Sequence, residues 1–416
     1  MTATARPEGL SAYIAVTAAY WGFMLTDGAL RMLVLLHFHE LGFSPVTLAW
    51  LFLLYEIAGI VTNLSAGWLA ARFGLTTTLY AGLTLQIIAL LALSQLDPNW
   101  AMALSVAFVM AVQGLSGVAK DLAKMSSKSA VKLLAPAGGG LFRWVAVLTG
   151  SKNAIKGLGF FLGAALLGLA GFETGILTMA AGLGAILVGV VLFMPSGLPK
   201  GSEAAKFSHV FATDPRVNRL SLARMFLFGA RDTWFVVGVP IYFHQVLSDG
   251  TPEGARQAFF LVGGFMALWI IAYGAVQAWA PRLLNAGAYS MEEIAGLAIV
   301  WVGRLALIPA ALALAALGSG VFGSGIWLTP VLAAGLMLFG FVFAVNSSVH
   351  SYLILAFAGT ERVTMDVGFY YMSNAAGRLL GTLLSGISYQ LGGLALCLGM
   401  AALMAGASFL AARRLV

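Results

Sequence analysis

Two charged residues lie near the middle of an apolar segment that is long enough to cross a bilayer. The sequence GFMLTDGALRML, residues 22–33, contains Asp27 and Arg31, which are four residues apart and therefore on one face of a helix. Each charge costs roughly 2.5–3.5 kcal/mol on insertion scales, so each needs a partner, a watery cavity or a ligand. Two interpretations follow. The residues form a self-neutralising buried pair, or Arg31 binds an anion while Asp27 is its counter-ion or a proton site.

Two further carboxylates lie in apolar segments. Glu56, in LFLLYEIAGIV, has no basic residue within four positions on its own helix. A lone buried carboxyl group can exchange a proton near neutral pH, so Glu56 is the first candidate for proton coupling, followed by Asp27 and Asp232. A structural hydrogen bond or an ion pair with a cavity arginine is the alternative for Glu56. Beside Asp232, Arg231 is expected inside the membrane, and Arg224 at its surface.

Basic residues and amides recur in the later apolar segments. Lys152 and Lys156 flank Asn153, and Arg378 follows Asn374 by four residues. Arginine binds oxyanions through two parallel hydrogen bonds, whereas lysine acts as a point charge. Snorkelling to the membrane surface is the alternative, above all for Lys156. The residues predicted to bind an anionic ligand are Arg31, Lys124, Lys128, Lys152, Asn153, Arg231, Asn374 and Arg378.

A ladder of four lysines at i,i+4 spacing contains Lys120, Lys124, Lys128 and Lys132. Like charges at this spacing destabilise an isolated helix, so something anionic should face them. Lipid headgroups and a funnel that attracts an anion are both open at this point.

Composition identifies a polytopic membrane protein. Of the 416 residues, 60% are hydrophobic and 9% are charged, with a mean hydropathy of +0.93, against about 25% charged residues in ordinary soluble domains. The N-terminus lacks a cleavage pattern for a signal peptide. The single cysteine, Cys397, excludes an intramolecular disulfide and a cysteine-rich metal centre. No cofactor, metal or nucleic-acid partner is expected, and His37, His39 and His244 are interpreted as membrane-surface residues.

Windows of about 20 apolar residues predict twelve spans in two sets of six. A polar break at 196–216 separates an N-terminal half, 1–195, from a C-terminal half, 217–416. Lysine and arginine concentrate at the termini and in even-numbered connections, so both termini are predicted to be cytoplasmic. The spans are 12–38, 46–71, 75–95, 100–123, 141–170, 175–195, 217–247, 258–284, 291–316, 326–350, 364–390 and 392–412.

The two halves repeat weakly. Residues match at an offset of 205 between spans 1 and 7, and at an offset of 221 between spans 4 and 5 and spans 10 and 11. With the six-plus-six topology, this predicts an all-α membrane protein with the major facilitator fold, in which ligand binds between pseudo-twofold halves. The matches include Phe23 with Phe228, Asp27 with Asp232, His39 with His244, and Asn153 with Asn374.

The connection after the second span resembles a loop motif of the major facilitator superfamily. In GWLAARFGLTTTLYAG, Gly67, Arg72 and Gly74 stand at the motif positions, and Ala71 replaces the acid of the motif. The resemblance assigns these residues to a cytoplasmic gating loop.

At closer range the chain resembles the organoarsenical efflux permeases of arsenic-resistance operons. The resemblance implies export of 1-arseno-3-phosphoglycerate and a functional partner, glyceraldehyde-3-phosphate dehydrogenase, that makes this ester. The similar stretches are YWGFMLTDGALRMLVLLHFHELG, FLLYEIAGIVTNL, AKDLAKMSSKSAVKLL, LTGSKNAIKGLGFFLGA and FLFGARDTWFVVGVP.

The surplus of basic residues in the spans independently favours an organic anion over a cationic drug. We expect a monomeric, proton-coupled carrier in the inner (plasma) membrane, and not an enzyme. The nearest alternative is an organophosphate/phosphate antiporter or another organic-anion carrier. A membrane-embedded enzyme and a non-transporting sensor are alternatives of other classes, but the sequence contains neither a catalytic constellation nor an appended signalling domain.

Overall fold

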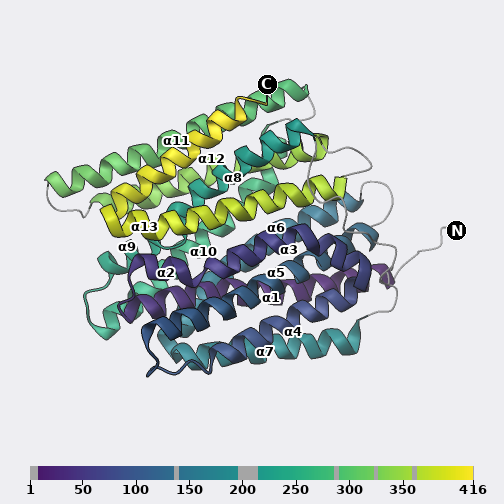
Figure 1. Ribbon diagram of the computed structural model, residues 1–416, viewed down its shortest axis with the longest axis horizontal. Coiled ribbons are helices and arrows are strands. Elements are labelled where there is room, and N and C mark those ends of the chain that lie inside the picture. Colours follow the sequence, from purple (N-terminus) through teal and green to yellow (C-terminus); the bar gives the residue numbers. More distant parts are fainter. Residues whose placement is uncertain are drawn as a thin grey trace.

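The computed structural model describes residues 8–134, 140–194, 214–284, 290–322, 327–357 and 363–415, in which helices run side by side as a bundle (Figure 1). The predicted linker 196–216 lies outside the described residues as far as 213. The helices are α1 (Glu8–Glu40), α2 (Pro45–Leu51), α3 (Leu53–Phe73), α4 (Leu75–Leu93), α5 (Met102–Leu134), α6 (Gly140–Ala170), α7 (Phe172–Phe193), α8 (Pro215–Phe235), α9 (Gly238–Leu247), α10 (Pro252–Leu283), α11 (Met291–Phe322), α12 (Leu328–Phe357) and α13 (Val363–Ala412).

Ten segments within the described residues are long and apolar enough to cross a membrane. One of them, Asp366–Ala412, contains a break at Gly392 and Gly393 and covers the last two predicted spans. The pair α8 and α9 covers the predicted span 217–247 but is not among the ten. The segments therefore correspond to the predicted spans, while the count of twelve crossings stays a prediction.

Span 7, predicted as one helix, is broken between α8 and α9. Pro240 has no backbone N–H to donate, and its ring would clash with the carbonyl group of the residue four positions earlier. The helix therefore cannot continue unchanged through this turn. The Ser385 hydroxyl of α13 accepts hydrogen bonds from the N–H groups of Val237 and Gly238, both at 3.1 Å. These two N–H groups are thus satisfied without water, as a membrane interior requires.

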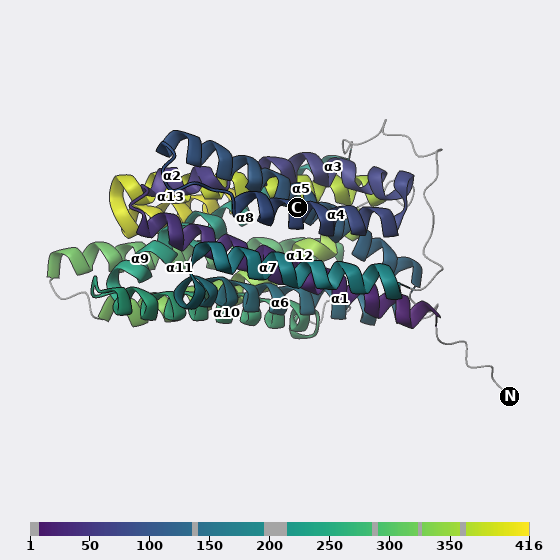
Figure 2. The same cartoon turned by 90° about the horizontal axis from the view of Figure 1, so that it is seen from below.

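The two sets of helices lie on opposite sides of the bundle. In Figure 1 the purple-to-blue helices α1 to α5 and the teal helix α7 occupy the lower side, and α8 and α11 to α13 the upper side. Figure 2 shows that the helices stay aligned in the perpendicular view. Contacts between α6 and α10, α3 and α13, and α2 and α13 form the seam between the two sets. The partition into two halves, 1–195 and 217–416, remains a prediction that this arrangement supports.

Glycines bring the first and fifth spans of each set into close contact. A Cβ atom at Gly163 of α6 would lie 2.1 Å from the carbonyl oxygen of Ala29 in α1. A Cβ atom at Gly377 of α13 would lie 2.0 Å from the carbonyl oxygen of Met225 in α8. Small residues at these positions let the backbones approach, which is how membrane helices pack. The same device in both sets fixes the helices that carry most of the charged residues described below.

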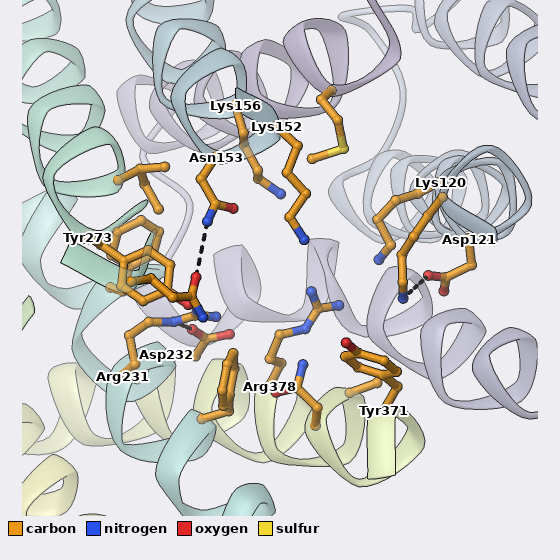
Figure 3. A pocket seen from close by; sticks show the side chains of 18 of the residues that line it. Lys120, Asp121, Lys152, Asn153, Lys156, Arg231, Asp232, Tyr273, Tyr371 and Arg378 are labelled. Carbon is orange, nitrogen blue, oxygen red and sulfur yellow. Dashed lines mark hydrogen bonds and ion pairs between the residues drawn. The ribbon is translucent and has the colours of Figure 1, made fainter. Parts of the chain in front are cut away.

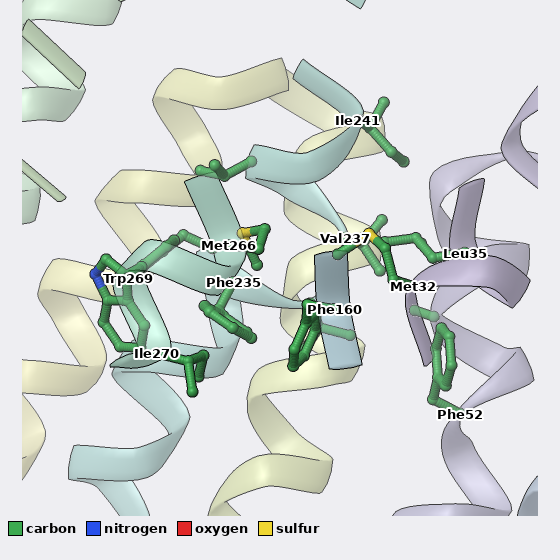
Figure 4. Packing of buried hydrophobic residues seen from close by; sticks show 14 of the residues in the cluster. Met32, Leu35, Phe52, Phe160, Phe235, Val237, Ile241, Met266, Trp269 and Ile270 are labelled. Carbon is green, nitrogen blue, oxygen red and sulfur yellow. The ribbon is translucent and has the colours of Figure 1, made fainter. Parts of the chain in front are cut away.

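An apolar cluster closes the seam toward the C-terminal ends of α1 and α9. Met32 and Phe52 from the first set meet Phe235 and Val237 from the second, with Phe160 of α6 between them (Figure 4). All five side chains are buried. Asp27 and Arg31 of α1 come before this cluster in the chain, as do Arg231 and Asp232 of α8, so these charged residues lie on its other side.

Candidate functional site

A cavity of about 210 Å³ lies between the two sets of helices. Figure 3 shows its labelled side chains converging from four sides: Lys152 and Lys156 from α6, Lys120 from α5, Arg378 from α13, and Arg231 from α8. Further charged residues complete this set, and the uncharged lining consists of Tyr20, Met24, Asn63, Asn153, Phe160, Phe228, Phe235, Ile270, Tyr273, Gln277, Ser351, Tyr371, Asn374 and Ala375.

The lining is strongly cationic. Two carboxylates, Asp121 and Asp232, face eight basic side chains. Two more buried carboxylates, Asp27 and Glu56, form ion pairs with lining residues but do not themselves line the cavity. When these two are included, eight basic side chains stand against four acidic ones. A low-dielectric cavity with one surplus sign of charge concentrates ligands of the opposite sign. The basic residues are Arg31, Lys120, Lys124, Lys152, Lys156, Arg224, Arg231 and Arg378.

Glu56 joins the two sets of helices. Its side chain is fully buried and accepts hydrogen bonds from Arg31 of α1, at 2.9 Å, and from Arg378 of α13. Arg31 belongs to the same half as Glu56, whereas Arg378 comes from the other half. One carboxylate therefore pairs with two guanidinium groups across the seam and balances the charge of only one of them, and this is the ion-pair alternative stated for Glu56 above.

The self-neutralising pair of Asp27 and Arg31 does not form. Asp27 instead accepts hydrogen bonds from Lys156 of α6, at 2.8 Å, and from the Tyr55 hydroxyl of α3, at 2.5 Å. Residues one turn apart on α1 face different neighbours, so Asp27 points to α6 while Arg31 reaches Glu56. The alternative that Lys156 snorkels to the membrane surface does not hold either, because its amine donates to Asp27 in the cavity wall.

The pseudo-equivalent acid Asp232 has a different partner. Its Oδ1 accepts a hydrogen bond from the adjacent Arg231 at 2.5 Å. At the offset of 221, Lys156 corresponds to Gly377, so the second half lacks the lysine that pairs with Asp27. The two halves thus hold a similar acid with different cations, and the cavity is chemically asymmetric.

Asp121 belongs to the lysine ladder that the sequence analysis described without it. It is fully buried on α5, pairs with Lys124 at 3.0 Å and accepts a hydrogen bond from Thr62 at 2.7 Å. Lys124 also donates to Asn63 at 2.6 Å. Lys120 and Lys124 line the cavity, so lipid headgroups are not what these two lysines face.

A chain of hydrogen-bonded polar groups connects α6, α10, α12, α8 and α13 at the cavity. Asn153 donates to Gln277 of α10 at 3.3 Å, and Gln277 donates to the Ser347 hydroxyl of α12 at 3.2 Å. Arg224 donates to the same hydroxyl at 2.9 Å and to Asn374 at 3.2 Å. Arg224 was expected at the membrane surface, but it is buried, because these acceptors replace the water that an interfacial guanidinium would use.

Seven of the eight predicted anion ligands line one cavity. Lys128 is the eighth, and its side chain lies outside the part of the chain whose side chains are described. Among the proton-coupling candidates, Asp232 lines the cavity, and Asp27 and Glu56 pair with residues that do. The functional roles stay predictions. The seven are Arg31, Lys124, Lys152, Asn153, Arg231, Asn374 and Arg378.

The predicted gating-loop residues lie in α3 and at the α3–α4 connection, and Arg72 and Gly74 are not among the residues that line the cavity. Gly67 and Arg72 are in α3, with Arg72 in its last turn. Gly74 precedes α4 with φ +86°, a backbone conformation that favours glycine. A tight turn is therefore one physical reason for glycine at this position.

Sequence reasoning missed Tyr55, Asp121 and Gln277 as parts of the site, and it left Lys120 open between lipid headgroups and an anion funnel. For Asp121 a signal existed, since it lies between Lys120 and Lys124 in an apolar helix and is one turn before the latter. Tyr55 and Gln277 carry no comparable signal, because their partners come from other helices.

The histidines predicted at the outer ends of spans 1 and 7 meet across the seam. The rings of His39 and His244 are in edge contact with centroids 5.2 Å apart, and His244 Nε2 lies 3.4 Å from Oε1 of Glu40. His37 stacks on Phe172 with centroids 3.9 Å apart. No group of three potential metal ligands occurs within the described residues.

A scan against protein-family models and a search of curated proteins found no match to this sequence. Solved structures match nearly the whole chain. A POT family transporter in complex with 5-aminolevulinic acid has a TM-score of 0.70 and 16% identity, covering 98% of this chain and 96% of the other. A peptide transporter POT in complex with sulfate has a TM-score of 0.69 and 14% identity, covering 100% and 95%.

The nucleoside transporter NupG has a TM-score of 0.66 and 17% identity, covering 97% of this chain and 98% of the other. Identities this low carry the fold alone. The all-helical bundle, its apolar segments and these three structures agree. The protein is a multi-pass membrane protein with the major facilitator fold that these solved structures share.

Proposed function

We propose that this protein is a secondary active transporter that exports a small organic oxyanion, and that it is not an enzyme. The observation that carries the proposal is the excess of cations in the central cavity, eight basic side chains against two acidic ones. Guanidinium and ammonium groups together suit phosphate-like oxyanions. A cationic substrate would meet repulsion on every wall.

The substrate we propose is 1-arseno-3-phosphoglycerate, so that export confers resistance to arsenate. A cavity of about 210 Å³ is smaller than the roughly 300–1,000 Å³ of sites for drug-sized ligands, which favours a small metabolite. The resemblance to organoarsenical efflux permeases narrows this class to the arsenylated ester. It also supplies the functional partner, a glyceraldehyde-3-phosphate dehydrogenase.

Glu56 occupies the position of an anion in the empty carrier. Its carboxylate engages Arg31 and Arg378, the pair best placed to hold the oxyanion. An incoming substrate competes for these guanidinium groups and releases Glu56 from Arg378, which belongs to the other half. Binding is thereby linked to separation of the halves, the step that alternating access needs.

Protons reset the carrier through the same carboxylates. A proton on Glu56 removes the charge that holds both arginines, and a proton on Asp27 does the same for Lys156. Asp232, paired with Arg231, is the third candidate. If a Glu56→Gln variant still exports substrate in response to a pH gradient, Glu56 is not the proton-coupling residue, and Asp27 is the next candidate.

The cavity opens toward the cytoplasm in our proposal. The apolar cluster around Met32, Phe52 and Phe235 seals the opposite side, and the positive-inside rule assigns both termini to the cytoplasm. The protein then works as a monomer in the inner membrane, without a cofactor. Substrate made in the cytoplasm has direct access to the cations.

Everted membrane vesicles test the substrate. They are supplied with arsenate, glyceraldehyde-3-phosphate, NAD and the dehydrogenase, and arsenic accumulation is measured while one component at a time is omitted. Accumulation that requires all four supports export of the organoarsenical. Accumulation from arsenate alone, or none, would discard this substrate. The control carrier has Glu173→Gln, an exposed acid at the start of α7.

The second candidate function is an organophosphate antiporter that exchanges substrate for inorganic phosphate. The same cationic cavity supports it, because phosphate needs the same donors. Vesicles preloaded with phosphate separate the two functions. Stimulation by phosphate on the opposite side favours exchange, and stimulation by a pH gradient favours proton coupling.

A further inference from the structure

Lys120 is a buried cation that the proposed mechanism leaves unused. It is 6% exposed, lines the central cavity, and its Nζ has no hydrogen-bond partner in the described part of the protein. The ammonium lies 3.9 Å from the centre of the Tyr55 ring. An aromatic face attracts a cation, but it does not replace the acceptors that three N–H donors need.

Other cations of the cavity have acceptors. Lys124 donates to Asn63 and Asp121, Lys156 donates to Asp27, and Arg224 donates to Ser347. A buried charge without an acceptor is costly. Lys120 therefore differs from these neighbours: the carboxylates of Asp121, Glu56 and Asp27 act on it electrostatically, but none of them accepts a hydrogen bond from it.

Two more unpartnered donors belong to residues that line the same cavity as Lys120. The Nε atoms of Arg31 and Arg378 are buried without a hydrogen-bond partner, although both guanidinium groups engage Glu56 through Nη2. The guanidinium of Arg31 lies 5.4 Å from the same Tyr55 ring that Lys120 contacts. The three cations thus surround the Tyr55–Glu56 segment of α3 from α1, α5 and α13.

We propose that Lys120 completes an oxyanion seat with Arg31 and Arg378, and that its ammonium directly binds the anionic group of the substrate. This inference rests on the proposed function and adds a ligand that the anion candidates above do not include. Three cations on one group favour a doubly charged oxyanion over a singly charged one. Phosphate and sulfate should therefore bind more tightly than nitrate.

Binding of inorganic phosphate, sulfate and nitrate to purified protein in detergent tests the seat. Lys120→Met is compared with wild type by calorimetry and thermal unfolding, with Lys120→Gln as a second variant if the first is not monodisperse. Arg256→Met is the matched control, because Arg256 is exposed on α10 and outside the cavity. Lys120→Arg keeps the charge.

We expect Lys120→Met to weaken phosphate binding at least about tenfold, or about 1.4 kcal/mol, and to reduce the preference for phosphate over nitrate. Without ligand, its melting temperature should rise, because an unpaired buried ammonium is removed. Lys120→Arg should retain more of the affinity. A purely structural cation on Tyr55 predicts the opposite: a lower melting temperature and unchanged affinity.

If the wild-type protein binds phosphate and Lys120→Met binds it with the same affinity, the proposed role of Lys120 is overturned. The proposed function as an anion carrier would still stand. Failure of the wild-type protein to bind either phosphate or sulfate would overturn the proposed function together with the seat. The two failures are therefore distinguishable.

Discussion

Glu56→Gln should tighten anion binding while destabilising the empty carrier. In the wild-type protein the carboxylate is fully buried and shared by Arg31 and Arg378. Glutamine is nearly isosteric but uncharged, so both guanidinium groups lose their counter-charge. Removing one partner of a buried ion pair costs about 3–5 kcal/mol, and the variant without ligand should lose stability of this order.

The gain in affinity follows from the same geometry. Each guanidinium freed from Glu56 can donate to the ligand, and a hydrogen bond to a charged group contributes about 1.5–3 kcal/mol. One such bond corresponds to roughly a tenfold to hundredfold decrease in the Kd for phosphate. The carboxylate no longer competes, so phosphate should also raise the melting temperature of the variant by more than that of wild type.

Calorimetry with phosphate and thermal unfolding with and without it measure both effects. Glu173→Gln, which removes an exposed acid from α7, is the matched control and should resemble wild type. Equal or weaker phosphate binding by Glu56→Gln would refute the view that Glu56 stands in for the substrate. In vesicles the variant should retain substrate exchange but lose its dependence on a pH gradient.

Three further outcomes are expected. Arg31→Ala should abolish flux in vesicles, since it removes one guanidinium from the proposed seat and leaves its carboxylate partner half paired; full flux would remove this arginine from the site. Gly163→Ala should lower stability by about 1–3 kcal/mol, because the new Cβ would meet a backbone carbonyl of α1 at 2.1 Å, whereas Gly182→Ala on open α7 surface should have little effect on the melting temperature. Hydrogen bonds from Arg216 lower the pKa of Asp214, which caps α8. Stability from this cap is therefore present above the ordinary aspartate pKa of about 3.9 and lost as pH falls through the lower folded value, so the small deficit of Asp214→Ala at pH 7 should vanish in acid.

The sequence determined the protein's class and most of the residues that meet in the cavity. Hydropathy is a local property, and a run of apolar residues must bury its backbone polar groups in a helix inside a membrane. Charges within such runs must leave the lipid, so Arg31, Lys152, Arg231 and Arg378 could be assigned to an internal site before any contact was known. The repeat and the six-plus-six pattern likewise indicated where two halves should meet.

Only the tertiary structure decided which charge pairs with which. Asp27 and Arg31 are neighbours on one helix, yet Asp27 binds Lys156 and Arg31 binds Glu56, because the partners come from α6 and α3. Similarly, Arg224 was predicted at the membrane surface, but it is buried because Ser347 of α12 and Asn374 of α13 accept its hydrogen bonds.

Lys120 shows most clearly that the sequence alone cannot decide what a charged side chain contacts. Along the chain it is one of four evenly spaced lysines, and spacing alone cannot distinguish a lysine that faces lipid from one that faces a cavity. Its burial, the Tyr55 ring beneath it and its lack of an acceptor depend on helices distant in sequence. Helix periodicity fixes the face of a side chain, whereas packing of the helices decides what that face meets.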